Sequence, residues 1–165
     1  MATTSYGVGC KNIKTGPVGV DGAMGAVLTS VGKLYKNTVS IVDEDGAVTK
    51  HTAEGDRYPF LNVLDAAGTI IKFTLTDITP ANMLLWLGGT VAATTWKAPN
   101  ASFSTEQSWS ADTIFGTTIK VPRLFMHCKL TWNMNRTEIA KLEVTGEVMT
   151  PDKVDEAPIS MATTV

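Results

Sequence analysis

Residues 123–132 read Arg-Leu-Phe-Met-His-Cys-Lys-Leu-Thr-Trp, and they carry the clearest structural pattern in the chain. Successive side chains of a β-strand point to opposite faces, so residues two apart share a face. One row here is apolar or carries a thiol, and the intervening row is mostly polar. The apolar row consists of Leu124, Met126, Cys128, Leu130 and Trp132. The stretch therefore predicts a long amphipathic strand with one face in the core.

A second alternating stretch follows from Glu138 to Met149, after a short connection rich in Asn. Its apolar row contains Leu142, Val144 and Val148. Its polar row contains Lys141, Glu143, Thr145 and Glu147. The two stretches are expected to pair as a hairpin. Because the polar row is long, it must face water.

Residues 69–76 also alternate, and they lead into a helix signal. Thr79 can cap a helix that has Pro80 at its first position, and Gly88-Gly89 would end it, so the helix is expected near 80–87. A helix of this length needs an apolar face packed on the sheet. The predicted core consists of Ile71, Phe73, Leu75, Leu84, Trp86, Leu87, Leu130, Trp132, Leu142 and Val144.

The remaining strands are read from turn signals. Residues 33–42 and 47–52 are predicted to pair across Asp45-Gly46, with the acidic run 43–46 as a solvated hairpin tip. Residues 109–121 read as a strand interrupted at Asp112 and Gly116. The segment 90–107 is rich in Ala, Thr and Ser and receives no firm assignment.

These elements together predict a mainly β fold: a small β-sandwich or partly rolled β-barrel with one short flanking α-helix. A chain of 165 residues with 44% apolar side chains can fill a single core. Residues 31–150 are expected to form the domain. The Gly-rich residues 1–30 and the polar residues 151–165 are expected to be extended arms that order against a neighbouring subunit.

No constellation of nucleophile, acid and base can be assembled from the sequence, so an enzyme is not expected and no cofactor is implied. His51 and His127 fall on polar strand faces of remote strands, which gives little support for a metal site. His127 and Cys128 are neighbours and point to opposite faces. Cys10 and Cys128 are expected to be free thiols.

The charge pattern bears on partners. The formal charge of −2 lacks the basic excess that direct nucleic-acid binding requires, and no stretch is apolar enough for a membrane span. The charged fraction of 18% is low for a soluble monomer, which favours large surfaces buried by partners. We read no targeting signal, so the chain is expected to be made in the cytoplasm.

The segment from Ile71 to Thr90 resembles the strand, short helix and Gly-Gly-Thr turn of tail tube proteins of long-tailed, siphovirus-type bacteriophages. There a strand leads through an acidic turn into an amphipathic helix that ends in Leu-Gly-Gly. The segment from Lys129 to Pro151 is similar to the C-terminal hairpin of the same family. The two segments cover about a quarter of the chain.

The resemblance implies a virion protein, assembled in the host bacterial cytoplasm, that forms stacked hexameric rings around a channel for the viral genome. It further implies contacts with tape measure, tail terminator and baseplate proteins. Double-stranded DNA would pass without sequence-specific binding, and Lys141, Glu143, Thr145 and Glu147 are candidates to line the channel.

Two alternatives stay open at this point. The tube of a contractile injection or secretion system has the same architecture and is not distinguished by these residues. A monomeric carbohydrate- or surface-binding β-sandwich would use exposed aromatic side chains, for which Trp96 and Trp109 are the candidates.

Overall fold

A computed structural model describes residues 9–133 and 135–163 of the chain. The fold is mainly β with one short helix, as the sequence predicts. Eight strands form one sheet, in which β2-β1-β9-β10-β11-β6-β3 lie in this order and β12 also pairs with β10. Their bounds are β1 Cys10–Gly16, β2 Thr29–Ser30, β3 Ser40–Asp43, β6 Thr69–Leu75, β9 Thr105–Thr113, β10 Thr117–Thr131, β11 Lys141–Val148 and β12 Ser160–Thr163.

The long strand β10 bends this sheet into a roll. Its register against β9 shifts between Val121 and Leu124, around Pro122. Before the shift β10 pairs with β12, and after it β10 pairs with β11 on that side. The two halves of the sheet therefore cover the core from two sides, as in a small sandwich, and the roll does not close into a barrel.

The core lies between these two halves. Ile13, Trp109 and Val121 enter it from the β1 side, and they form one buried cluster with side chains of β6, β10 and β11. Six predicted core residues are confirmed as buried, namely Ile71, Phe73, Leu75, Trp86, Leu142 and Val144. Leu87 and Leu130 are partly buried and pack against this cluster.

Two predicted core residues are exposed instead. Leu84 is 41% exposed because Met83 and Trp86 supply the buried face of the helix, and Leu84 is turned away from that face. Trp132 is 55% exposed. It follows Thr131, the last residue of β10 that pairs with β11, so its side chain lies beyond the edge of the core.

Helix α1 (Pro80–Leu87) begins and ends where the sequence predicts. The side chain of Thr79 accepts a hydrogen bond from the N–H of Asn82 (3.3 Å), and the N–H of Gly88 bonds to the carbonyl of Leu84 (3.1 Å). Trp86 meets Phe73 edge-on, with ring centroids 5.8 Å apart. This contact fixes the helix on the sheet.

The unassigned segment after the helix contains a small hairpin of its own. Strands β7 (Thr90–Ala92) and β8 (Thr95–Lys97) pair with each other. The indole N–H of Trp96 donates to the carbonyl of Gly88 (2.8 Å), which ties this hairpin to the end of the helix.

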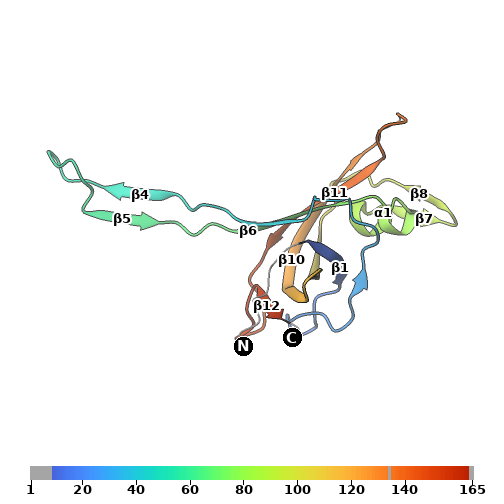
Figure 1. Cartoon of the computed structure of the whole chain (residues 1–165), viewed down its shortest axis with the longest axis horizontal. Helices are drawn as coiled ribbons and strands as arrows, with labels where there is room; N and C mark the ends of the chain where they lie inside the picture. The colour runs from blue at the N-terminus through green and yellow to red at the C-terminus, as the bar shows by residue number, and fades with distance from the viewer. Residues whose placement is uncertain (1–8, 134, 164–165) are drawn as a thin grey trace.

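A long two-stranded arm projects from the body (Figure 1). Its strands are β4 (Val48–His51) and β5 (Leu61–Leu64), which pair only with each other. The predicted turn at Asp45-Gly46 is wrong, because the arm turns later, between His51 and Leu61. Gly46 instead lies along the side of the arm, where an added Cβ would be 1.8 Å from the carbonyl oxygen of Asp65. The glycine is needed there for close approach of two backbones.

The prediction of an N-terminal arm over residues 1–30 is wrong from Cys10 onward. Strand β1 lies inside the sheet between β2 and β9, and its Ile13 is completely buried. The glycines that suggested a loose arm instead let the following loop fold back tightly. At Gly25, an added Cβ would be 2.1 Å from the carbonyl oxygen of Pro17. Residues 1–8 lie outside the described residues.

The C-terminal segment is polar and largely exposed as predicted, but it is attached to the body rather than extended from it. Arg123 pairs with Asp152 (2.7 Å), and Lys153 pairs with Asp21 (3.0 Å). The segment then returns as β12 along the first half of β10.

We expect Trp86→Ala to lower the free energy of unfolding by about 3 to 5 kcal/mol, because it empties a large buried site against Phe73. Chemical denaturation of the purified protein measures the change. Leu84→Ala, in the same helix but on its exposed side, is the matched control and should cost less than about 1 kcal/mol. Equal losses for both variants would contradict this assignment of the helix faces.

Candidate interaction surface

The polar row predicted from the sequence lies on the outer face of the sheet. Along β11, Leu142, Val144 and Gly146 are buried, while Glu143 and Glu147 between them are exposed. Lys141 and Thr145, on the same side as the glutamates, are half-buried. All four candidate channel residues, Lys141, Glu143, Thr145 and Glu147, therefore share the face turned away from the core.

Neighbouring strands add positive charge to this face. Lys129 on β10 lies directly across from Glu143, and Lys72 on β6 lies across from Thr145. The ammonium group of Lys141 lies 4.4 Å from the ring centroid of Tyr35. The face is thus mixed in charge and not acidic. The pattern along one strand could not show this, because it does not reveal which residues lie across from it.

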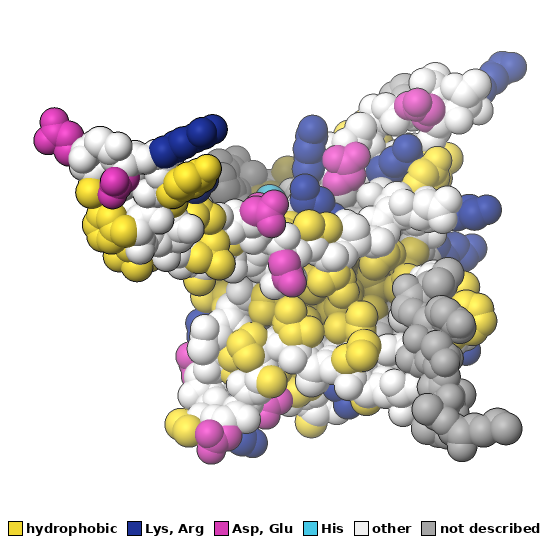
Figure 2. Space-filling model, turned by 60° about the vertical axis from the view of Figure 1, so that its left-hand side comes forward, with side chains coloured by type: hydrophobic (Ala, Val, Ile, Leu, Met, Phe, Trp, Pro, Cys, Tyr) yellow, Lys and Arg dark blue, Asp and Glu magenta, His cyan; other side chains and the backbone are white. Residues whose placement is uncertain are grey.

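The arm carries large apolar side chains that have no core to enter. All eight residues of β4 and β5 are exposed. Cross-strand partners share a face, so Val63 with Thr49 and Leu64 with Val48 lie on opposite faces of the arm. Figure 2 shows apolar side chains over the projecting arm and over the part of the body beside it. The exposed apolar residues between the arm's base and tip are Val48, Tyr58, Phe60, Leu61, Val63 and Leu64.

The two tryptophans that the sequence offers as a sugar-stacking surface are not freely exposed. Trp109 is completely buried, and Trp96 is half-buried with its indole N–H already bonded to Gly88. Of the two tryptophans that left a carbohydrate-binding module open, one is therefore part of the core.

The histidines and cysteines are dispersed over the molecule. His51 lies on the arm and His127 on the polar face of β10. Within residues 9–133 and 135–163, no group of three or more His, Cys, Asp or Glu side chains is placed to hold a metal ion. Both cysteines are free thiols. Burial raises the pKa of Cys128 to about 12, with a smaller contribution from the charge of Glu143.

No protein-family model matches this chain, and no curated protein matches it either. In the part of the chain that the structure describes, no helix has the length and apolarity needed to cross a membrane.

The thiol of Cys128 gives a pH-dependent prediction. Its folded pKa is raised, so the folded state keeps the proton while the unfolded thiol ionises above its ordinary value of 9.0. This contribution to stability is complete below pH 9 and is lost as the pH rises towards 12. We expect Cys128→Ser to make the free energy of unfolding fall less steeply between pH 9 and pH 10.5, as measured by urea denaturation. Burial raises the pKa of the Cys10 thiol too, but by less, so Cys10→Ser should flatten the pH dependence to a smaller extent.

Proposed function

We propose that this chain is the structural subunit of a phage tail tube, which assembles with copies of itself into stacked hexameric rings around a channel for genome delivery. The observation that carries the proposal is the exposed arm formed by β4 and β5. The tail-tube resemblance of residues 71–90 and 129–151 supports the particular class of assembly.

The arm requires a partner for physical reasons. An isolated two-stranded hairpin is marginally stable in water at best, and this one has apolar side chains exposed on both faces. Covering a Leu, Val or Phe side chain stabilises a contact by about 1.5 to 3 kcal/mol when burial is complete. Exposed apolar surface of this extent marks an interaction site.

The shape of the molecule favours a repeating assembly. An arm that projects from one copy and docks on the body of the next makes a heterologous contact, in which two different surfaces meet. Such contacts close into rings when the rotation between copies closes, and otherwise continue as a filament. A tube of stacked rings contains both kinds of contact: contacts that close within each ring, and contacts that repeat along the stack.

The polar sheet face suits a channel through which DNA passes. Glu143 and Lys129 face each other across two strands, and Glu147 and Lys72 lie on the same face. Because the charges are of both signs, the face offers no continuous basic patch to hold phosphates. We therefore assign Lys141, Glu143, Thr145 and Glu147 to the channel wall, with double-stranded DNA as a passing cargo.

The proposal places the protein in the virion tail after assembly in the bacterial cytoplasm, with tape measure, terminator and baseplate proteins as further partners. It assigns no catalytic role and no cofactor. The tube of a contractile injection or secretion system is the second candidate, because the arm serves stacked rings there equally well. The buried state of Trp109 speaks against the carbohydrate-binding module.

Assembly tests the proposal directly. We expect the purified chain to form rings or tubes in negative-stain microscopy. The double variant Leu61→Ser, Val63→Ser removes two apolar side chains from one face of the arm. It should raise the concentration at which assembly is half complete by at least about tenfold, equivalent to ~1.4 kcal/mol.

The matched control is Val154→Ser, which changes an exposed valine outside the arm. Val154→Ser should assemble at the same concentration as the parent. Urea denaturation should give the same free energy of unfolding for the parent and both variants. A parent chain that remains monomeric at every concentration would refute the proposed function.

The channel assignment has its own test. We expect Glu143→Lys, Glu147→Lys to assemble normally, because both side chains are exposed on a face that already contains lysines. The variant tubes should retain double-stranded DNA in low salt and release it as salt rises, whereas parent tubes should not retain it. Co-sedimentation measures retention. Equal retention of DNA by variant and parent tubes would contradict the channel assignment and would indicate that this face lies on the outside of the particle.

A further inference from the structure

The roll of the main sheet is open along one side. Near one end the segment from Val31 to Tyr35 bridges its two edges. The N–H of Val31 donates to the carbonyl of Ile13 (3.0 Å), and the N–H of Tyr35 donates to the carbonyl of Thr74 (2.8 Å). Beyond this bridge the edges separate, and a cleft of about 720 Å³ lies between them.

Both walls of the cleft are edges of β-strands. On one side, β2 pairs with β1 only at Lys14 and Thr15, so no described strand covers residues 10–12 there. On the other side, β3 pairs with β6, and its second edge has no partner strand among the described residues. Cys10 from the first wall and Ile41 from the second both line the cleft. Unpaired strand edges are templates for another strand.

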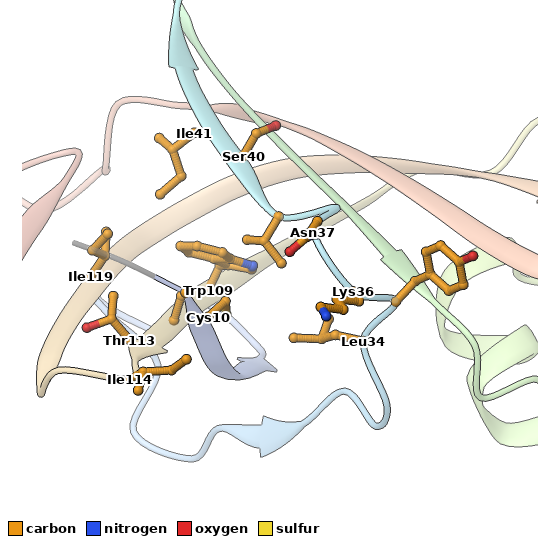
Figure 3. Close-up of a pocket in the computed structure, with 14 residues that line it drawn as sticks. Cys10, Leu34, Lys36, Asn37, Ser40, Ile41, Trp109, Thr113, Ile114 and Ile119 are labelled. Carbon is orange, nitrogen blue, oxygen red and sulfur yellow. The ribbon is translucent and has the colours of Figure 1, made fainter. Parts of the chain in front are cut away.

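The floor of the cleft is apolar and contains one buried polar group without a partner. Leu34, Val39, Ala111 and Ile119 line it together with Trp109. Figure 3 shows Trp109 between Cys10 and Ile41, with its ring nitrogen on the side of Asn37. Trp109 is completely buried, and its indole N–H has no acceptor among the described residues.

An extended peptide fits these features better than a small apolar ligand does. A strand between two edges can bond through its backbone to both, and alternate side chains can fill an apolar floor. A small apolar molecule would cover the floor but would leave both edges open.

We propose that this cleft accepts an extended strand from a second copy of the chain, paired with the open edges of β1 and β3. The inference rests on the proposed function and names a surface through which copies join. A second copy is favoured because the rim of the cleft is itself exposed and apolar, with Ile41 and Ile114 on its two sides. Every copy of the chain also carries exposed extended strands, β4 and β5, which pair only with each other.

Two neighbouring residues of β3 provide a matched pair of variants. Ile41 lines the cleft, whereas Val42 is the next residue and points to the opposite face of the strand. Their exposed fractions are 36% and 56%, so a lysine is tolerated by the fold at either position. We expect Ile41→Lys to raise the half-assembly concentration by about tenfold or more and Val42→Lys to change it less than about threefold.

A native thiol reports whether the cleft is filled. Cys10 lines it, while Cys128 does not. The alkylation rate of each thiol by N-ethylmaleimide is measured by peptide mass spectrometry in dilute monomer and in assembled particles. Assembly should slow the alkylation of Cys10 by about tenfold relative to Cys128, and Ile41→Lys monomer at the same concentration should show the fast rate.

The outcomes separate the two proposals. If the parent assembles but Cys10 reacts equally fast in monomer and particle, the cleft is not an interface. This result would refute the cleft inference and leave the proposed function intact. If Cys10 is already protected in dilute monomer and becomes reactive when residues 1–8 are removed, the occupant is the chain's own N-terminal segment, which also overturns it. A parent chain that never assembles refutes both the inference and the proposed function.

Discussion

The rest of the fold depends on the bend in β10, and one buried hydroxyl group holds that bend. The side chain of Ser108 donates to the carbonyl of Pro122 (2.6 Å) and accepts from the N–H of Gly25 (2.8 Å). Proline removes a backbone donor, and the skipped register leaves its carbonyl without a ladder partner. Ser108 satisfies that carbonyl in the core. It also binds the loop after β1, so the two halves of the sheet and the N-terminal segment are fixed at one point.

Local patterns predicted the elements that have one buried face. The strands at 69–75 and 141–148, the helix at 80–87 and most of their buried side chains follow from alternation and capping. Such signals are strong because a one-residue shift in the pairing register would expose the whole apolar row to solvent. The sandwich-like architecture could be predicted for the same reason.

Other features depend on contacts between distant segments, which no local pattern contains. Strand β1 was missed because its buried residues are separated by small and polar ones, and its place in the sheet comes from pairing with β9 about a hundred positions later. The hairpin predicted for residues 33–42 and 47–52 is wrong because Asp45-Gly46 is a good turn sequence that the pairing of the flanking strands overrides: β3 pairs with β6, and β4 pairs with β5. The positive charges beside Glu143 and Thr145 became visible only with the register between strands.

The contrast between the packed body and the bare arm also has a consequence for the order of events in time. The body has a buried core of its own, whereas β4 and β5 gain order mainly from each other. In the assembly that we propose, the entropy cost of fixing an arm would be offset when another subunit covers it. The first encounter between two free subunits would then order two arms for little contact, while each later subunit would join a surface that is already rigid. Such growth would be nucleated: it would show a lag at low concentration, the lag would shorten abruptly when preformed ends are added, and single subunits would accumulate until a template is present.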